Sequence, residues 1–277
     1  MVRIITDSST LYTAEEARKA GFESVPLCVS MGDWHGRDLQ MDMETFYQKI
    51  EEGGIPTSSQ PPIGDVLDVY EAHRGEEMIN ISMADGLSGT YQSACSAREM
   101  AGNREDITVF NSRTLCGPHR YMVEQAQRMA EGGSSKDEIL RWLSGAAART
   151  ESFLIPQDFS FLKRGGRLTP VAAAIGGLLK LKPIVKLTDD GMKLDKFGIK
   201  RTMSSAVDSI VTHLKGKSLG AEHLMYVSHA DALGDALAVK KLFGTVFPEM
   251  EVRILELSPV FVAQGGPRCV AVQYIER

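Results

Sequence analysis

The first half of the chain alternates short apolar runs with helical patterns, and this alternation limits the possible folds more than any other feature. Strands separated by helices form a largely parallel sheet with helices on both faces. In such folds, ligands bind beyond the carboxyl ends of the strands. Polar loops at residues 6–10, 84–88 and 111–114 each follow one of the apolar runs. We therefore expect these three loops to converge at one edge of the sheet.

The second half has a different pattern and predicts a separate domain. A basic, glycine-broken link at residues 161–168 marks the change, and it leads into a very apolar helix predicted over residues 170–181. A hairpin with an Asp-Gly turn follows over residues 184–194, and the remaining strands and helices indicate a mixed α+β unit. Two domains are the expected number for 277 residues. The predicted organisation is an α/β domain over residues 1–157 and an α+β domain over residues 158–277.

Local signals place several elements of the first domain. Thr13 and Ser135 each open a capping box, so a helix is predicted to start at each of them. Residues 23–30, rich in Val and Leu, predict one strand, while the polar stretch 32–41 indicates no particular element. Prolines on both sides of residues 57–60 favour an extended loop. Its hydroxyl groups either bind a ligand or cap the next helix.

Ser88 lies between a buried strand, predicted over residues 78–83, and the helix that follows. The first turn of a helix has unpaired backbone N–H groups and the positive end of the helix dipole, so a hydroxyl there suits an anion site. Capping of its own helix is the alternative role for this serine. A nucleophilic serine is a third reading, but residues 86–90 lack the last glycine of the hydrolase elbow, and no histidine is obviously placed as a base.

Charge, cysteine spacing and missing motifs exclude several classes of protein. The net charge of −5, without a long basic run, argues against nucleic acid as the main partner. No apolar run is long enough to span a bilayer, and the N-terminus resembles a strand rather than a signal peptide, so we expect a cytoplasmic protein. The four cysteines and six histidines lack ligand spacing, which predicts free thiols and no metal. Both glycine-rich phosphate-binding motifs are missing, so no nucleotide cofactor is expected.

Motifs spread in order along nearly the whole chain resemble the DegV family of fatty-acid-binding proteins. The most specific are Leu-Ser-Gly-Thr-Tyr-Gln-Ser-Ala at residues 87–94 and Lys-Arg-Gly-Gly-Arg at residues 163–167. The remaining motifs are Ile5-Thr6-Asp7-Ser8, Val25-Pro26-Leu27, Thr57-Ser58-Ser59-Gln60-Pro61, Lys182-Pro183-Ile184 and Lys200-Arg201.

The resemblance implies a two-domain α/β protein that holds one long-chain fatty acid at the domain junction, with its acyl tail buried. It further implies a carrier, not itself an enzyme, that presents the carboxylate to a separate ATP-dependent fatty-acid kinase. The acyl phosphate formed then feeds phospholipid synthesis. No cofactor is implied beyond the bound fatty acid, and membrane contact is expected to be transient, without stable insertion. A serine-dependent acyl hydrolase and a lipid-sensing regulatory protein are the alternatives.

The same resemblance implies a set of residues that hydrogen-bond the carboxylate. The matching motif positions are Ser58, Ser88 and Arg167, and we expect the backbone N–H of Gly89 to join them. In the family a histidine near the C-terminus completes the set, and Gln264 stands at that position in this chain. An amide can donate a hydrogen bond to a carboxylate but cannot carry a charge.

Overall fold

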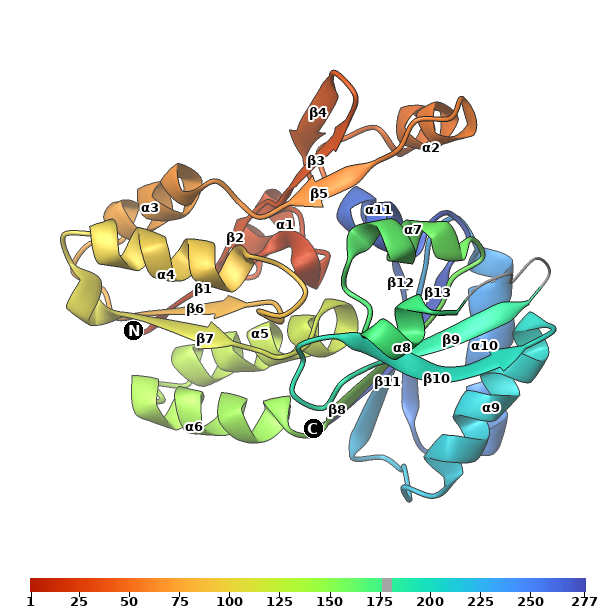
Figure 1. Cartoon of the computed structure of the whole chain (residues 1–277). Helices are drawn as coiled ribbons and strands as arrows, with labels where there is room; N and C mark the ends of the chain where they lie inside the picture. The colour runs from red at the N-terminus through yellow and green to blue at the C-terminus, as the bar shows by residue number, and fades with distance from the viewer. Residues whose placement is uncertain (176–180) are drawn as a thin grey trace. The chain divides into compact units, whose positions relative to one another are not determined.

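The chain forms two compact units, residues Met1–Ala148 and Arg149–Arg277. The computed structural model describes residues 1–175 and 181–277 (Figure 1). Within these residues, no helix is both long and apolar enough to cross a membrane. The helix predicted over residues 170–181 is described only in part, and Ala174 already ends its first segment. Its beginning is the short helix α8 (Pro170–Ala173), and residues 176–180 lie outside the described residues.

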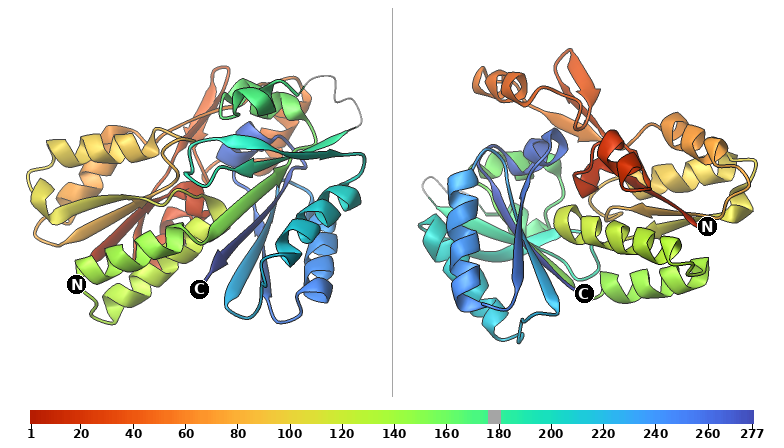
Figure 2. Two further views of the ribbon diagram at one scale, coloured as in Figure 1. Left: turned by 60° about the horizontal axis from the view of Figure 1, so that its bottom comes forward. Right: turned by 180° about the vertical axis from the view of Figure 1, so that it is seen from behind.

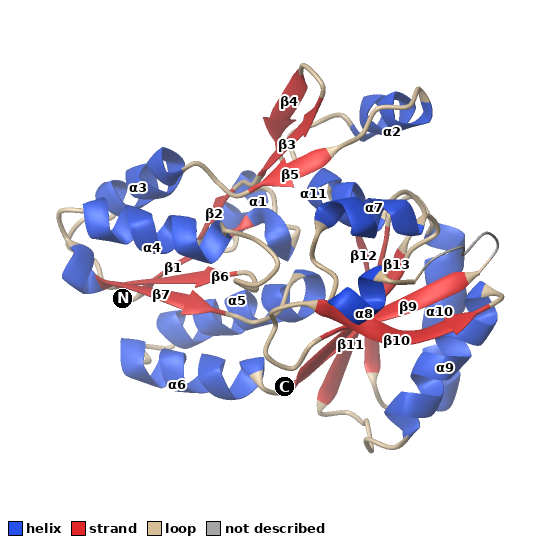
Figure 3. Cartoon of the chain, in the orientation of Figure 1, coloured by secondary structure: helices blue, strands red, loops and turns tan. Residues whose placement is uncertain are grey.

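The first unit is built on a parallel sheet, as the alternation of strands and helices predicts. The sheet has the strand order β2-β1-β6-β7, and every neighbouring pair is parallel (Figure 3). Its strands are β1 (Arg3–Asp7), β2 (Glu23–Val25), β6 (Met78–Ser82) and β7 (Ile107–Asn111). Because the strands are parallel, their carboxyl ends all lie at one edge of the sheet.

Helices cover both faces of this sheet. Figures 1 and 2 show α3 and α4 on one face and α5 and α6 on the other. The bounds are α1 (Ala14–Lys19), α3 (Ile63–Ala72), α4 (Thr90–Met100), α5 (Cys116–Glu131) and α6 (Lys136–Ala147), with 3₁₀ turns η1 (Ser8–Thr10) and η2 (Arg104–Asp106). Tyr70 of α3 and Ala94 of α4 are buried in one cluster with Ile5 of β1. Both predicted capping boxes are present, at Thr13 and at Ser135.

A small antiparallel sheet lies between β2 and α3 in the sequence. It contains β3 (Cys28–Met31), β4 (Trp34–Arg37) and β5 (Thr57–Ser59), in the order β4-β3-β5, with α2 (Met43–Glu51) between β4 and β5. The single strand predicted over residues 23–30 is therefore wrong. Pro26 has no N–H to continue a ladder, and the Leu27 N–H is bound by a side chain, so the chain leaves the parallel sheet there.

The second unit is a mixed α+β unit, as predicted. Within its described residues the sheet has the order β10-β9-β8-β13-β11-β12, antiparallel except for the parallel pair β11 and β12. The strands are β8 (Thr150–Ile155), β9 (Lys182–Leu187), β10 (Leu194–Lys200), β11 (His223–His229), β12 (Glu251–Glu256) and β13 (Val270–Glu276). The predicted hairpin with the Asp-Gly turn is the pair β9 and β10.

The helices of the second unit pack on a large apolar core. Helices α9 (Met203–Lys215) and α10 (Leu233–Val246) bury side chains against one face of the sheet, in a cluster that includes Ile210, Phe243 and Phe153. Helices α7 (Phe159–Gly165) and α11 (Pro259–Gly265) contact each other. The sequence reading did not identify α11, which has only 7 residues, too few to show a clear helical period.

The boundary between the units lies before β8, not after it. We predicted the change at residues 157 and 158, but β8 pairs with β13 and β9 and so belongs to the second sheet. Phe153 and Ile155 of this strand are buried in the core of the second unit. The link at residues 161–168 contains the end of α7, where Gly166 has a φ of 73°, a backbone conformation that suits glycine.

Candidate functional site

The three polar loops converge at the carboxyl edge of the parallel sheet, as expected. The Met83 N–H donates to Asp7 Oδ2 at 2.9 Å, and the Ala84 N–H donates to the Thr114 carbonyl at 2.9 Å. A weaker bond of 3.3 Å joins the Asp85 N–H to Asn111 Oδ1. The loops after β1, β6 and β7 are therefore tied directly to one another.

Ser88 lies just before α4, with its hydroxyl partly exposed. Its Oγ is 2.8 Å from Thr90 Oγ1 and accepts a long bond of 3.3 Å from the Thr90 N–H. Gly89 is the N-cap residue of α4, and no side chain caps the helix there. The capping role considered for Ser88 is thus met only by this long bond to the first N–H of α4.

The extended segment at residues 57–61 is held against the start of α4. The Ser93 hydroxyl donates to the Pro61 carbonyl at 2.9 Å. The Gln60 amide oxygen packs on Gly89 so closely that a Cβ added at Gly89 would overlap it. Ser58 lies in the same segment, as the central residue of β5. The structure therefore brings the Ser58 segment and the Ser88–Gly89 loop together within the first unit.

In the second unit the structure brings Arg167 and Gln264 to one glycine. Arg167 Nη1 donates to the carbonyl of Gly165. A Cβ added at Gly165 would overlap the Gln264 amide oxygen. The same Cβ would lie 3.9 Å from Cδ of Arg167. The side chains of two residues far apart in the sequence, one after α7 and one on α11, thus both approach Gly165.

His119, on α5, is a buried histidine that sequence reasoning did not place. Its Nδ1 is 2.8 Å from Ser9 Oγ, and its Nε2 is 3.0 Å from the Ile81 carbonyl and 3.2 Å from Thr6 Oγ1. Burial lowers the pKa of His119, and the Asp7 carboxylate and the Ile81 carbonyl oppose that change. The neutral ring, with Nε2–H donating to Ile81, fits this arrangement. No motif signalled it, because its partners come from β1, η1 and β6, which are distant from it in the sequence.

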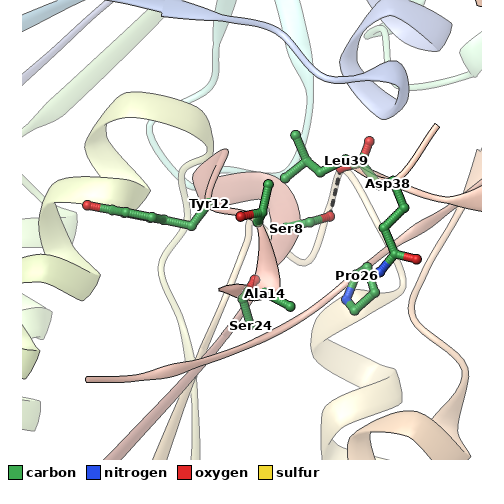
Figure 4. A pocket seen from close by; sticks show the side chains of 9 residues that line it. Ser8, Tyr12, Ala14, Ser24, Pro26, Asp38 and Leu39 are labelled. Carbon is green, nitrogen blue, oxygen red and sulfur yellow. Dashed lines mark hydrogen bonds between the residues drawn. The ribbon is translucent and has the colours of Figure 1, made fainter. Parts of the chain in front are cut away.

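A small pocket lies beside the turn η1, which contains Ser8 (Figure 4). It is lined by Ser8, Tyr12, Thr13, Ala14, Ser24, Pro26, Asp38, Leu39 and Gln40, and its volume is about 20 Å³. That is room for about one water molecule, so this pocket cannot hold an acyl chain. Among residues 1–175 and 181–277, no group of three or more His, Cys, Asp or Glu side chains is placed to hold a metal ion.

The fold is that of a two-unit α/β protein, with polar loops at the carboxyl edge of the parallel sheet in its first unit. Comparison with known proteins gives the family. A match to the DegV family covers residues 1–277, and the chain belongs to that family.

Relatives of known sequence and structure match over nearly their full lengths. A DegV domain-containing protein of Clostridium acetobutylicum is 30% identical over 281 residues, which are 99% of this chain and 97% of that protein. The crystal structure of DegV from Bacillus subtilis, described as a fatty acid binding protein, has a TM-score of 0.86 at 26% identity and covers 100% of this chain and 99% of its own. A DegV family protein from Thermus thermophilus, described by its fatty acid binding, has a TM-score of 0.88 at 26% identity with the same coverage.

Proposed function

We propose that this protein binds a single long-chain fatty acid, with the tail buried and the carboxylate hydrogen-bonded, and carries it to a separate fatty-acid kinase. The DegV proteins of B. subtilis and T. thermophilus support the first part, since both are described as binding fatty acids and both match this chain from end to end. The arrangement of residues around Ser88 in this chain supports it as well.

The observation that carries the proposal is the packing of the Ser58 segment on the Ser88–Gly89 loop. The contact of Gln60 with Gly89 and the bond from Ser93 to Pro61 hold the segment that carries Ser58 against the start of α4, next to Ser88. A carboxylate accepts hydrogen bonds from hydroxyl and backbone N–H donors, and the positive end of a helix dipole favours its charge. The proposed carboxylate ligands here are Ser58, Ser88 and the Gly89 N–H.

Arg167 and Gln264 are the proposed carboxylate ligands from the second unit. Their shared contact with Gly165 supports a common role. Arg167 supplies a positive charge that no change of pH in the physiological range removes. Gln264 supplies an amide donor without a charge. Head-group recognition in this chain therefore relies on fixed hydrogen bonds and one guanidinium, and on no titrating histidine at position 264.

The tail supplies the affinity in this proposal. A sixteen-carbon chain buries about fourteen methylene groups, roughly 11 kcal/mol at ~0.8 kcal/mol each. Association and ordering subtract several kcal/mol from that sum. The carboxylate ligands then set the orientation of the molecule and the position of its head group.

The proposed partner of the loaded protein is the kinase. A carrier with neither nucleotide-binding motif depends on a kinase to form the acyl phosphate, which would supply phospholipid synthesis. The four cysteines are all free thiols, which supports a reducing compartment such as the cytoplasm. The partner's role is tested by incubating the loaded protein with a fatty-acid kinase and ATP and trapping acyl phosphate with hydroxylamine.

The geometry favours a carrier over an acyl hydrolase. A nucleophilic serine needs a base within hydrogen-bond reach. Among the residues that the structure describes, Ser88 Oγ has its hydrogen bonds with Thr90, and none with a histidine or a carboxylate. His119 is buried and bonded to Ser9.

The first test is native mass spectrometry of the purified protein, followed by denaturing extraction. We expect a stoichiometric adduct that is released as a long-chain fatty acid. The Ser88→Ala variant is then compared with Ser96→Ala, which removes an exposed hydroxyl of the same helix that bonds only to the Gln92 carbonyl. Loss of one hydrogen bond to a charged group costs about 1.5–3 kcal/mol, so Ser88→Ala should weaken palmitate binding at least tenfold and Ser96→Ala should not.

A protein that is empty and resists loading with any fatty acid would contradict the proposal. Equal palmitate affinity for the wild type and Ser88→Ala would remove Ser88 from the site while leaving the carrier role intact. Turnover of a short acyl ester that disappears in Ser88→Ala would support the hydrolase instead.

A further inference from the structure

The turn after β1 is polar and buried, and the proposed carboxylate ligands do not include it. Asp7 and Ser8 are 2% and 1% exposed. A buried carboxylate or hydroxyl is unfavourable unless hydrogen bonds satisfy it. The partners of these two side chains therefore show what the turn does.

Asp7 holds the beginning of the loop that carries Ser88. Its Oδ1 accepts from the Ser9 N–H and its Oδ2 accepts from the Met83 N–H, both at 2.9 Å. Met83 directly follows β6 and opens the loop that ends at Ser88 and Gly89. One carboxylate thus fixes the end of β1 to the start of the Ser88–Gly89 loop.

Ser8 holds both ends of the β3–β4 hairpin. Its hydroxyl donates to Asp38 Oδ2 at 2.7 Å, as Figure 4 shows, and accepts from the Leu27 N–H at 3.1 Å. Leu27 directly precedes β3 and Asp38 directly follows β4. Since β5 pairs with β3, with Ser58 opposite Val29, the position of Ser58 depends on the same hydroxyl.

Helix α5 also holds the turn by hydrogen bonds. His119 Nδ1 bonds to Ser9 Oγ at 2.8 Å. Arg120 Nη1 donates to the Leu11 carbonyl at 3.1 Å and to the Thr10 carbonyl at 3.4 Å. The turn is therefore bonded on both sides and cannot shift without breaking several hydrogen bonds.

We infer that Asp7 and Ser8 are positioning residues for head-group recognition: Asp7 aligns the Ser88–Gly89 loop and Ser8 aligns the strand that carries Ser58. This inference rests on the proposed function, because it names what the two buried groups align. Hydrogen bonds weaken steeply when donor and acceptor are misaligned. A small shift of either segment therefore costs a charged head group more than a neutral one, while the tail is unaffected.

The test compares two ligands with the same tail, palmitic acid and hexadecan-1-ol, on the full-length protein. In Asp7→Asn, an amide NH₂ replaces one of the two oxygens that accept from the Ser9 and Met83 N–H groups, so one of these bonds is lost. Ser8→Ala removes both hydrogen bonds of the hydroxyl. Each variant should lose about tenfold in affinity for the acid and little for the alcohol. Tyr70→Phe is the matched control, because it removes a buried hydroxyl bonded to Asn80 and should leave the acid-to-alcohol ratio unchanged.

A milder pair of variants covers the case in which Asp7→Asn or Ser8→Ala fails to fold. Asp38→Ala removes the acceptor of the Ser8 hydroxyl and should lower the ratio of the affinity for the acid to the affinity for the alcohol. Asp38→Asn keeps an acceptor oxygen and should restore it. A merely structural role would lower both affinities together and the melting temperature with them.

The outcomes separate the inference from the function it rests on. A wild-type protein that binds the acid no better than the alcohol overturns the proposed carboxylate site itself. A wild-type protein that prefers the acid, with the same preference in every folded variant at Asp7, Ser8 and Asp38, overturns the positioning role alone.

Discussion

Gly165 is the residue on which the second unit's two candidate ligands meet. Its missing side chain leaves the space that the Gln264 amide occupies, and its carbonyl accepts from Arg167. A methyl group there would push the amide away. Gly165→Ala should therefore weaken palmitate binding about fivefold or more, the worth of one hydrogen bond, as measured by displacement of a fluorescent fatty acid.

The control for this prediction is Gly244→Ala in α10, where an added Cβ meets no atom within 4 Å. A helical alanine there should raise the free energy of unfolding by about 0.5–1 kcal/mol and leave palmitate binding unchanged. If Gly165→Ala also leaves palmitate binding unchanged, the contact between Gly165 and Gln264 plays no part in recognition of the head group.

Single residues were predictable from the sequence where the motif is local. Ser88 and Gly89 are adjacent and follow a clear strand, so their place at the start of α4 was visible. The approach of Gln264 to Gly165 and the bonds of His119 depend on residues distant in the chain. Such contacts have no period or spacing to read, and only the fold brings them together.

At the scale of elements, prediction succeeded where one local signal decided the outcome. The capping boxes at Thr13 and Ser135 start helices because side chain and backbone satisfy each other within four residues. It failed at residues 23–30, where β-forming residues favour a strand but Pro26 ends one sheet and Leu27 begins the approach to another. Tertiary pairing, not propensity, decided that stretch.

Glu151 joins β8 to β9 and α9 and provides an element-scale prediction. Its carboxylate lies 2.8 Å from Lys186 Nζ, 3.0 Å from Lys217 Nζ and 3.0 Å from His213 Nε2. Burial by itself raises the pKa of Glu151, but the hydrogen bonds from Lys186 and Lys217 outweigh it and hold the pKa below its usual value. Glu151→Gln should therefore lower the free energy of unfolding at pH 7 by about 1–3 kcal/mol, between the values for exposed and buried pairs.

The sign of the pH dependence follows from that lowered pKa. A carboxyl group that is more acidic in the folded protein contributes its full stability above its unfolded pKa of about 4.3 and loses it as the pH falls through the folded value. The difference between the wild type and Glu151→Gln, measured by urea unfolding, should be constant near neutrality and shrink below about pH 4. Glu256→Gln, on an exposed position of β12, is the control and should change stability by less than about 0.5 kcal/mol. A difference that grows in acid would show that Glu151 is not a stabilising carboxylate.

At the scale of the whole molecule, the sequence predicted two units of the right classes but assigned β8 to the wrong one. The strand follows α6 closely and continues the alternation of the first unit, so the pattern alone favoured that unit. Its partners, β13 and β9, come later in the chain. Antiparallel pairing across such separations leaves no local signal.

The boundary can be tested with fragments of the chain. Residues 149–277 retain β8, whose Phe153 and Ile155 are buried in the core of the second unit, whereas residues 158–277 lack it. Removal of two large buried side chains costs about 2–5 kcal/mol each, and the loss of a central strand also leaves one edge of β13 and one edge of β9 unpaired. We expect cooperative thermal unfolding by circular dichroism for 149–277, and none for 158–277. Cooperative folding of 158–277 would instead place the boundary after β8, where the sequence alone had put it.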